Sequence, residues 1–447
     1  MPEAVSRPLP LVTQDDQTEV GSYFVATYPP FSVWSKEAVE TDALPALHAP
    51  PTGGPLGLYL HIPFCRKRCH FCYFRVYTDK NSQDVADYLD LVGREWELYT
   101  RLPAIEGRPL NFVYFGGGTP SFLSTTQLER LVGRLAARTP WDDAEEVTFE
   151  CEPGTLTGAK LAVIRRLGVT RLSLGIENFS DRLLELNGRA HRSPEVFRAY
   201  EQARALDFPQ INIDLIAGML GETEDNWQDC IRQTIALAPD SVTIYQMELP
   251  YNTTISADLL KGAGRFTEPV ANWSTKRRWV GEAFAALETA GYHARSAYTL
   301  VRDPATRFIY TDRVWSGGDL AALGVASFGR VSHVHMQNLD TWEAYAAAIG
   351  RGELPLSRAY RPTPEERLVR DFILQLKRGS LAPETFRDTY GVNVIERFRA
   401  PLASLVTDGY LAEASRDRIA LTREGLLRVD VLLRRFFLPQ HADVRYT

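Results

Sequence analysis

The stretch "YLHIPFCRKRCHFC" at residues 59–72 decides the fold, because it sets three cysteines in C-x3-C-x2-C spacing directly after a short β-rich run. These are Cys65, Cys69 and Cys72, and the chain of 447 residues has only five cysteines in all. Sparse, odd-numbered cysteines do not form a disulfide framework, so clustered thiols indicate metal or redox chemistry.

Spacing alone does not identify the metal. A structural zinc site normally has four protein ligands, so three thiols leave one position of a metal centre open. His61 precedes the cysteines in a predicted strand, where we expect a core residue, and His70 lies between them on a loop, where we expect a solvated side chain. A mixed Cys/His zinc site and an iron–sulfur cluster are equally compatible with this pattern.

Composition predicts a soluble globular protein of two or three domains, with 45% hydrophobic and 24% charged residues. The chain has no run approaching the roughly 18 apolar residues of a membrane span, and its N-terminus lacks the pattern of a secretory signal, so we expect a cytoplasmic protein. The formal net charge of -6 argues against nucleic acid as a partner and is compatible with a small-molecule substrate. The oligomeric state is left open, and a monomer is compatible with the sequence.

Outward from the cysteines, short β-rich runs alternate with segments of helical periodicity. In residues 84–102, for example, the apolar residues mark one helical face. Repeated βα units indicate a parallel sheet covered by helices, and six in succession favour a closed or partly closed barrel with its chemistry at the C-terminal strand ends. The six predicted strands are 57–62, 111–116, 146–151, 170–176, 211–218 and 241–247.

The chain divides into three predicted regions. Residues 1–54 are Pro-rich and form an N-terminal arm, whose aromatics either pack on the outside of the main domain or form a lid over a pocket. Residues 55–355 form the barrel. Residues 356–447 form a helical domain, in which the short hairpin "GYLAE…DRIALT" predicts a winged-helix-like fold that docks on the barrel.

Further motifs follow the cysteines in a fixed order: "FGGGTPSFL", "FECEPGTL", "RLSLGIENFSDRLL", "INIDLIAGMLGETEDNW" and "LGVASFG". Together with the cysteine motif they resemble the radical S-adenosylmethionine (SAM) superfamily, and within it the branch of oxygen-independent coproporphyrinogen dehydrogenase and its HemW-like relatives. The resemblance spans about residues 55–440. It implies an α/β fold, a partial parallel (β/α)6 radical SAM barrel followed by a HemN-like helical domain of winged-helix type.

The resemblance also implies the cofactors. In such enzymes Cys65, Cys69 and Cys72 would hold three irons of a 4Fe-4S cluster, and the fourth iron would bind SAM. An electron, supplied by a flavodoxin- or ferredoxin-type donor, then cleaves SAM to a 5′-deoxyadenosyl radical that abstracts hydrogen. The cofactor carries the difficult chemistry and the protein supplies placement.

The motifs also imply SAM contacts. Glycines that end the second strand would let backbone approach the methionine moiety, and buried carboxylates at strand ends are costly unless they are bonded. Arg189 matches a cofactor-carboxylate arginine, although Arg192 is an alternative register. The implied SAM-binding residues are Tyr59, Phe71, Gly116, Gly117, Gly118, Thr119, Glu150, Glu177, Arg189 and Asp214.

Departures from the family pattern bear on the reaction. Coproporphyrinogen enzymes carry another cysteine two positions after the third, where this chain has Phe74, and Glu177 replaces a common glutamine. The missing cysteine, the "YQMELPYNTTIS" segment and the long aromatic N-terminal arm favour the methylating branch, in which a second SAM provides a methyl group for methylation or cyclopropanation of an sp2 carbon. Coproporphyrinogen decarboxylation, with Arg66, Lys67 and Arg68 as candidate propionate ligands, and a HemW-like role in haem trafficking are the alternatives.

Overall fold

The computed structural model describes residues 24–442, and its main feature is one twelve-stranded sheet. The strand order is β12-β11-β10-β9-β1-β2-β3-β4-β5-β6-β8-β7. The central strands are β1 (Leu56–Ile62), β2 (Leu110–Gly117), β3 (Glu146–Cys151), β4 (Arg171–Glu177), β5 (Gln210–Ala217) and β6 (Ser241–Gln246).

Strands β1 to β6 run parallel, each beside the next, and all six predicted strands lie within one residue of the observed bounds. Both faces of these strands are largely buried, as expected for a parallel sheet covered by helices. The predicted α/β fold with a partial barrel and a helical C-terminal domain is confirmed.

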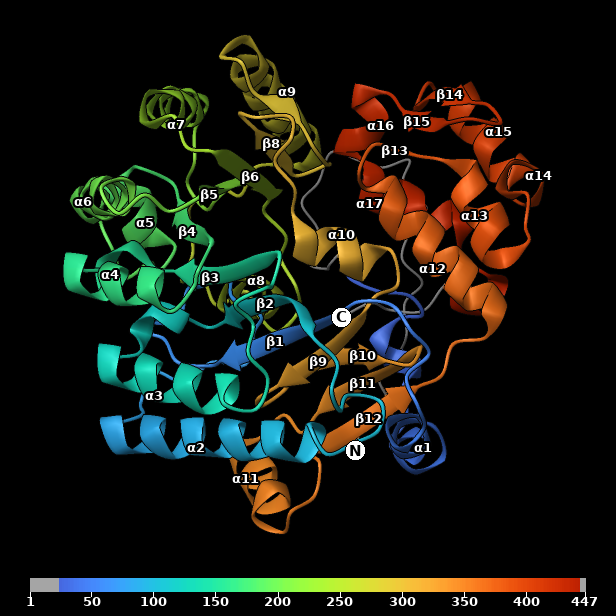
Figure 1. The fold of residues 1–447 in the computed structure, drawn as a ribbon. Helices are drawn as coiled ribbons and strands as arrows, with labels where there is room; N and C mark the ends of the chain where they lie inside the picture. The colour runs from blue at the N-terminus through green and yellow to red at the C-terminus, as the bar shows by residue number, and fades with distance from the viewer. Residues whose placement is uncertain (1–23, 443–447) are drawn as a thin grey trace.

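Helices follow the parallel strands and lie outside the sheet (Figure 1). They are α2 (Ser82–Tyr99), α3 (Thr125–Ala136), α4 (Gly158–Arg166), α5 (Asp181–Leu186), α6 (Ser193–Arg204) and α7 (Glu224–Leu237). The helix α2 begins at a capping box, in which Asn81 and Asp84 bond each other's backbone N–H. Its predicted apolar face, from Val85 to Tyr99, is buried.

The sheet continues beyond the six repeats on both sides. Strand β9 (Asp319–Leu323) pairs parallel with β1, and antiparallel strands then follow on each edge. These are β10 (Phe328–Val331), β11 (Val334–Asn338) and β12 (Leu356–Tyr360) on one side and β8 (Thr299–Val301) and β7 (His293–Ala294) on the other. The sheet therefore extends past residue 355, the predicted end of the barrel region.

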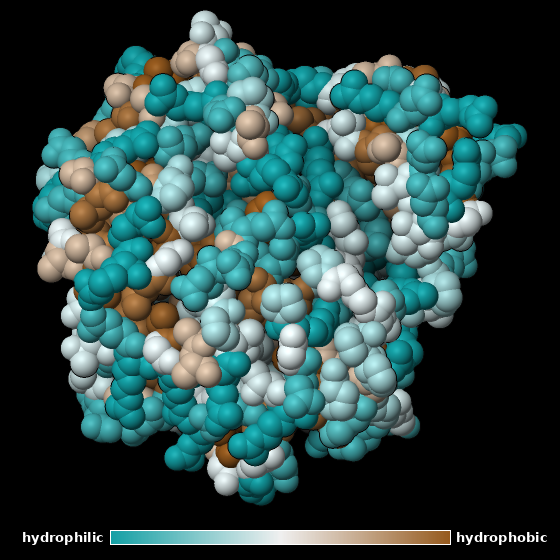
Figure 2. Space-filling view, in the orientation of Figure 1, coloured by the Kyte–Doolittle hydropathy of each residue, from teal (hydrophilic) through white to brown (hydrophobic). Residues whose placement is uncertain are grey.

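Four helices lie in the second half of the barrel region. They are α8 (Thr254–Lys261), α9 (Trp273–Thr289), α10 (Ile309–Trp315) and α11 (Trp342–Gly350). In the part of the chain that is described, no helix is long and apolar enough to cross a membrane. The face in Figure 2 is largely hydrophilic, with hydrophobic residues showing mostly on the barrel side.

The C-terminal domain lies beside α9 and α10 (Figure 1). A three-stranded sheet in the order β13-β15-β14 packs with its helices, in a winged-helix-like arrangement. The elements are α12 (Pro364–Leu376), β13 (Ser380–Leu381), α13 (Pro383–Tyr390), α14 (Val394–Arg397), α15 (Arg399–Thr407), β14 (Leu411–Ala414), β15 (Ile419–Leu421), α16 (Arg423–Leu427) and α17 (Val429–Leu432).

The described part of the N-terminal arm packs against the sheet edge and the C-terminal domain. Ser35 forms a β-bridge with Ala359 of β12, and the Trp34 ring stacks on His335 with centroids 5.2 Å apart. The Tyr28 hydroxyl accepts a hydrogen bond from the Leu438 backbone N–H at 2.9 Å. These contacts follow the outside-packing alternative for the arm, which also includes the short helix α1 (Leu44–His48); its residues 1–23 lie outside the described part.

Candidate functional site

The three clustered cysteines lie on the loop between β1 and α2, at the C-terminal end of the first barrel strand. The Cys65 N–H donates to the Tyr77 carbonyl at 3.1 Å and the Cys72 N–H to the Cys69 carbonyl at 3.2 Å, which fixes the loop backbone. Burial raises the pKa of the Cys65 thiol to about 11 and that of Cys72 to about 12. Without a metal these thiols are therefore protonated, and metal binding would have to release their protons.

Two side chains from other barrel loops contact the thiols. Thr119, after β2, donates from Oγ1 to Cys65 Sγ at 3.3 Å, and Arg189, after α5, donates from Nη1 to Cys69 Sγ at 3.3 Å. Within residues 24–442, no three His, Cys, Asp or Glu side chains converge closely enough to hold a single metal ion.

His70 is not the solvated loop residue that we expected. Its backbone N–H donates to the Asn187 carbonyl at 3.0 Å, and its ring Nδ1 lies 3.0 Å from the Leu186 carbonyl. The residue is half-buried because this loop packs against the segment after α5. His61 is buried in β1, as expected, and burial lowers its pKa to about 4.

Two predicted carboxylates, Glu150 of β3 and Asp214 of β5, belong to strands that flank β4. Glu150 accepts hydrogen bonds from the Tyr114 hydroxyl at 2.7 Å and the Gly117 N–H at 3.2 Å, while Asp214 accepts from Ser173 Oγ at 2.7 Å. Burial raises the pKa of Glu150 to about 7 and that of Asp214 to about 6, and the Asp214 charge adds to the rise at Glu150. Perturbed carboxylates gathered at strand ends are typical of a functional site.

Glu177 ends β4 with a positive φ of 67°, a backbone conformation that is uncommon outside glycine. Its carboxylate lies 3.5 Å from Arg189 Nη2, and burial raises its pKa to about 7. The same guanidinium donates to the Gly175 carbonyl at 2.5 Å, whereas its buried Nε has no hydrogen-bond partner among the described residues. The structure thus brings Arg189 next to both Cys69 and Glu177.

Arg192, the alternative register, does not reach the thiols. Its side chain donates to the Arg189 and His191 carbonyls and pairs with Glu185 at 3.4 Å. Its role is therefore to hold the local backbone.

The three glycines after β2 have packing reasons of their own. A Cβ at Gly117, whose φ is 106°, would lie 2.6 Å from the His61 ring, and one at Gly118 would lie 2.8 Å from the Ile62 carbonyl oxygen. A Cβ at Gly116 would meet the Tyr114 ring at 2.9 Å. Three glycines are thus what the packing requires, and their presence alone does not indicate a ligand.

The two aromatic candidates lie in different surroundings. Tyr59 stacks on Tyr114 with ring centroids 5.9 Å apart, and its hydroxyl lies 3.3 Å from His61 Nδ1. Phe71 packs against a small apolar cluster that includes Leu220 and Met247. Tyr114 therefore lies between Tyr59, on which its ring stacks, and Glu150, to which its hydroxyl donates. Phe71 instead packs against residues that follow β5 and β6.

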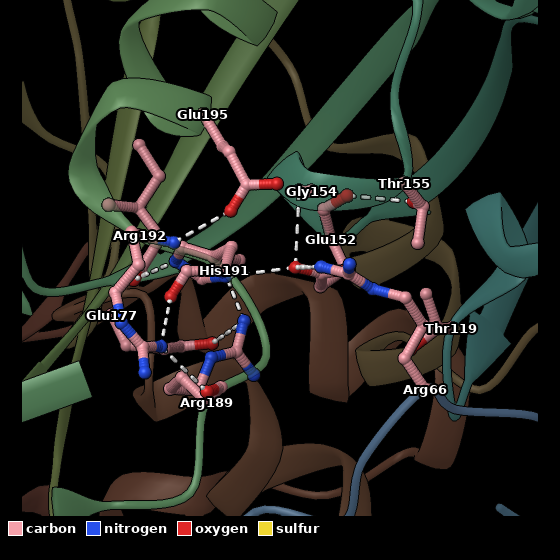
Figure 3. A network of polar contacts seen from close by, with 12 residues as sticks. Arg66, Thr119, Glu152, Gly154, Thr155, Glu177, Arg189, His191, Arg192 and Glu195 are labelled. Carbon is pink, nitrogen blue, oxygen red and sulfur yellow. Dashed lines mark hydrogen bonds and ion pairs between the residues drawn. The ribbon is translucent and has the colours of Figure 1, made fainter. Parts of the chain in front are cut away.

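An ion network of Arg66, Glu152 and His191 lies next to the thiol loop and was not predicted from the sequence. Arg66 binds Glu152 through two hydrogen bonds, of 3.1 and 3.0 Å, and His191 Nδ1 lies 3.1 Å from the same carboxylate (Figure 3). Burial alone would raise the pKa of Glu152, but the bonds from His191 and Arg66 outweigh it and lower the pKa to about 2. Arg66 is thus committed to an internal partner and is not an available propionate ligand. The "ECEP" motif was the available signal, because it places a second acidic residue two positions after Glu150.

Comparison with known proteins identifies the domain that carries this site. The Radical SAM superfamily profile matches residues 59–234. These residues are similar to a radical SAM domain. The superfamily uses a 4Fe-4S cluster and SAM, and the donor set fits both: three thiols on one loop, and a buried guanidinium whose Nε lacks a partner among the described residues.

Similarity extends well beyond the radical SAM domain. The chain is 28% identical to the heme chaperone HemW of Bacillus subtilis over 372 residues, which is 83% of this chain and 96% of that protein. It is 28% identical to the oxygen-independent coproporphyrinogen III oxidase of Pseudomonas aeruginosa over 387 residues, 85% of this chain and 81% of that protein. The structure of coproporphyrinogen III oxidase (HemN) from Escherichia coli, a radical SAM enzyme, superposes with a TM-score of 0.80 at 25% identity, covering 92% of this chain and 96% of HemN.

The comparisons support the HemN/HemW-like resemblance and do not support the methylating branch that the sequence reading favoured. None of these three relatives is described as a methyltransferase. That prediction rested on the missing cysteine at Phe74, the "YQMELPYNTTIS" segment and the aromatic arm, whereas the similarity to HemN and HemW covers most of the chain.

Proposed function

We propose that this chain is a radical SAM enzyme that binds a 4Fe-4S cluster through Cys65, Cys69 and Cys72 and one SAM at the C-terminal ends of the strands. The bound cofactors would supply reductive cleavage of SAM to a 5′-deoxyadenosyl radical. The observation that carries the proposal is that Arg189 reaches Cys69 Sγ at 3.3 Å while the carboxylates of β3, β4 and β5 gather at the same end of the sheet.

Different residues are suited to different parts of SAM. Glu150, with the Gly116 to Thr119 turn, is placed to receive the methionine ammonium, because its carboxylate already organises the Gly117 N–H. Asp214 is suited to the ribose hydroxyls, and Arg189, balanced by Glu177, to the methionine carboxylate. The exposed Lys67 and Arg68 offer a basic surface for an acidic electron donor.

For the substrate we propose a tetrapyrrole, because a heme chaperone and two coproporphyrinogen oxidases resemble this chain over most of its length. The Phe74 position keeps methyl transfer with a second SAM as a second candidate. Tyr73 and Phe74 directly follow the cluster cysteines, and their ring centroids are 4.5 Å apart. The two residues are 42% and 44% exposed. Phe74 stands at the position where the resemblance places the further cysteine of a coproporphyrinogen enzyme.

One anaerobic incubation tests the proposal and its alternatives. The protein is reconstituted with iron and sulfide, reduced, and supplied with methyl-labelled SAM and coproporphyrinogen III. Formation of 5′-deoxyadenosine together with carbon dioxide supports the tetrapyrrole reaction. Deoxyadenosine with S-adenosylhomocysteine and label in an added unsaturated substrate supports methyl transfer, and tight haem binding without turnover supports trafficking. A protein that binds no iron contradicts the proposal as a whole.

A further inference from the structure

The Arg66–Glu152–His191 network joins two parts of the site that are far apart in sequence. Arg66 directly follows Cys65, and His191 lies two residues after Arg189, which itself contacts Cys69. Glu152 stands between them and binds both (Figure 3). Backbone and side-chain contacts therefore link Cys65, through Arg66, Glu152 and His191, to Arg189 and so to Cys69.

Further hydrogen bonds hold Glu152, the central residue of the network, in place. The Glu152 carboxylate also accepts the Gly154 N–H at 3.1 Å, and the Glu152 N–H donates to Ser121 Oγ at 2.9 Å. The side chain of Glu152 is 10% exposed and that of His191 is fully buried. The carboxylate thus meets four hydrogen-bonding partners, and the two bonds from Arg66 join opposite charges, which makes them the strongest.

Two details show that the geometry is specific. Gly154 leaves room for Arg66, since a Cβ there would lie 2.0 Å from Arg66 Nη2. The second ring nitrogen of His191, Nε2, lies 3.2 Å from the Ile176 carbonyl, the residue before Glu177. The ring is therefore held from both sides, by Glu152 at Nδ1 and by the Ile176 carbonyl at Nε2.

We propose that Arg66, Glu152 and His191 are positioning residues, which hold Cys65 and Cys69 in register with Arg189 and thereby preform the cluster site. The inference deepens the proposed function and rests on it only for the role of the thiols. None of the three residues touches the reacting atoms; they act through the loop backbone and through Arg189.

The first test uses the apoprotein and needs no cluster. Iodoacetamide alkylation of Cys65 and Cys69 is followed by peptide mass spectrometry, with a cysteine-free peptide of the same digest as the internal reference. Loss of a charged hydrogen bond frees the loop, so Glu152→Gln accelerates modification of Cys65 and Cys69 roughly tenfold. Glu185→Gln is the matched control, because Glu185 is 73% exposed on the adjacent segment and pairs with Arg192; we expect the wild-type rate.

Two more variants separate position from charge. Gly154→Ala displaces Arg66 without removing any charge, and it should also accelerate alkylation. If Glu152→Gln fails to fold, Arg66→Gln serves the same test and should also accelerate alkylation. The Arg66 side chain is 37% exposed, so we expect its replacement to be tolerated. Wild-type alkylation rates in both Glu152→Gln and Gly154→Ala would overturn the proposal.

The reconstituted protein gives an independent reading. Removing a negative charge beside the thiols favours the reduced cluster, so Glu152→Gln should raise the midpoint potential measured by EPR titration, while Glu185→Gln should not. An unchanged potential in Glu152→Gln contradicts an electrostatic contribution of the network. If the wild type binds no iron, the proposed function fails, but the alkylation rates still decide whether the network positions the loop.

Discussion

Two buried carboxylates, Glu95 on α2 and Glu177 at the end of β4, show what separates a structural acid from a site acid. Burial raises the pKa of each to about 7. The Glu95 carboxylate receives the Gly324 N–H at 2.8 Å, Asn338 Nδ2 at 2.6 Å and the Tyr345 hydroxyl at 2.5 Å. Its hydrogen-bonding capacity is met by the protein itself.

The Glu177 carboxylate is arranged differently. Among the described residues its partner is Arg189, at 3.5 Å, and the guanidinium that faces it also contacts a cluster thiol. The raised pKa is therefore the same in both regions, whereas the partners differ. A perturbed pKa indicates a binding site only where the hydrogen-bonding capacity is left for a ligand.

The largest expected effect comes from the thiols. Cys69→Ala removes one of three cluster ligands, so the reconstituted protein should lose its iron and its brown absorbance almost completely, as iron analysis and visible spectra will show. The stability of the apoprotein should change by no more than about 0.5 kcal/mol, because Cys69 is partly exposed.

Cys230→Ala is the matched control for this change. Cys230 is a buried thiol in α7, and we expect its variant to retain iron while losing about 1 kcal/mol of stability through a small cavity. Full iron loading in Cys69→Ala would contradict the ligand assignment.

A second prediction contrasts the two carboxylates directly. Glu95→Gln cannot accept all three donors, and it leaves buried groups unpaired, so its free energy of unfolding should fall by about 2 kcal/mol. Glu177→Gln removes a charge that is costly to bury, so its free energy of unfolding should not fall. Urea unfolding of both apoproteins at pH 7 measures the difference, and equal losses would break the distinction drawn between them.

The sequence predicted the site at the level of elements better than at the level of contacts. Periodicity located β1 to β6 within one residue and placed Glu150, Glu177 and Asp214 at neighbouring strand ends, because parallel strands present their C-terminal ends at one edge. The antiparallel strands β10 to β12 were not predicted. They are four or five residues long, and such short runs give no clear period.

Contacts between distant segments account for the other misses. Glu152 and His191 are 39 residues apart, and no local pattern indicates that they meet. The three glycines from Gly116 to Gly118 were predicted to let backbone approach the cofactor, which stays a prediction. What the sequence did not predict is how closely neighbouring side chains and backbone pack against them. Which neighbour fills the space beside a glycine is a property of the packed sheet.

The smallest expected effect is on the pH dependence of stability. A carboxyl group whose pKa is raised from 4.5 to about 7 on folding binds a proton more readily in the folded state. Its contribution is therefore full below about pH 4.5 and is lost as the pH rises through 7, at up to about 1.4 kcal/mol per pH unit. Glu177→Gln should reduce the fall in apoprotein stability between pH 5 and pH 6 by about 1 kcal/mol. Urea unfolding at the two pH values checks this, with Glu185→Gln as the exposed control. If the slope in Glu177→Gln equals that of the wild type, the Glu177 carboxyl has its ordinary pKa, and Arg189 offsets the cost of burying its charge.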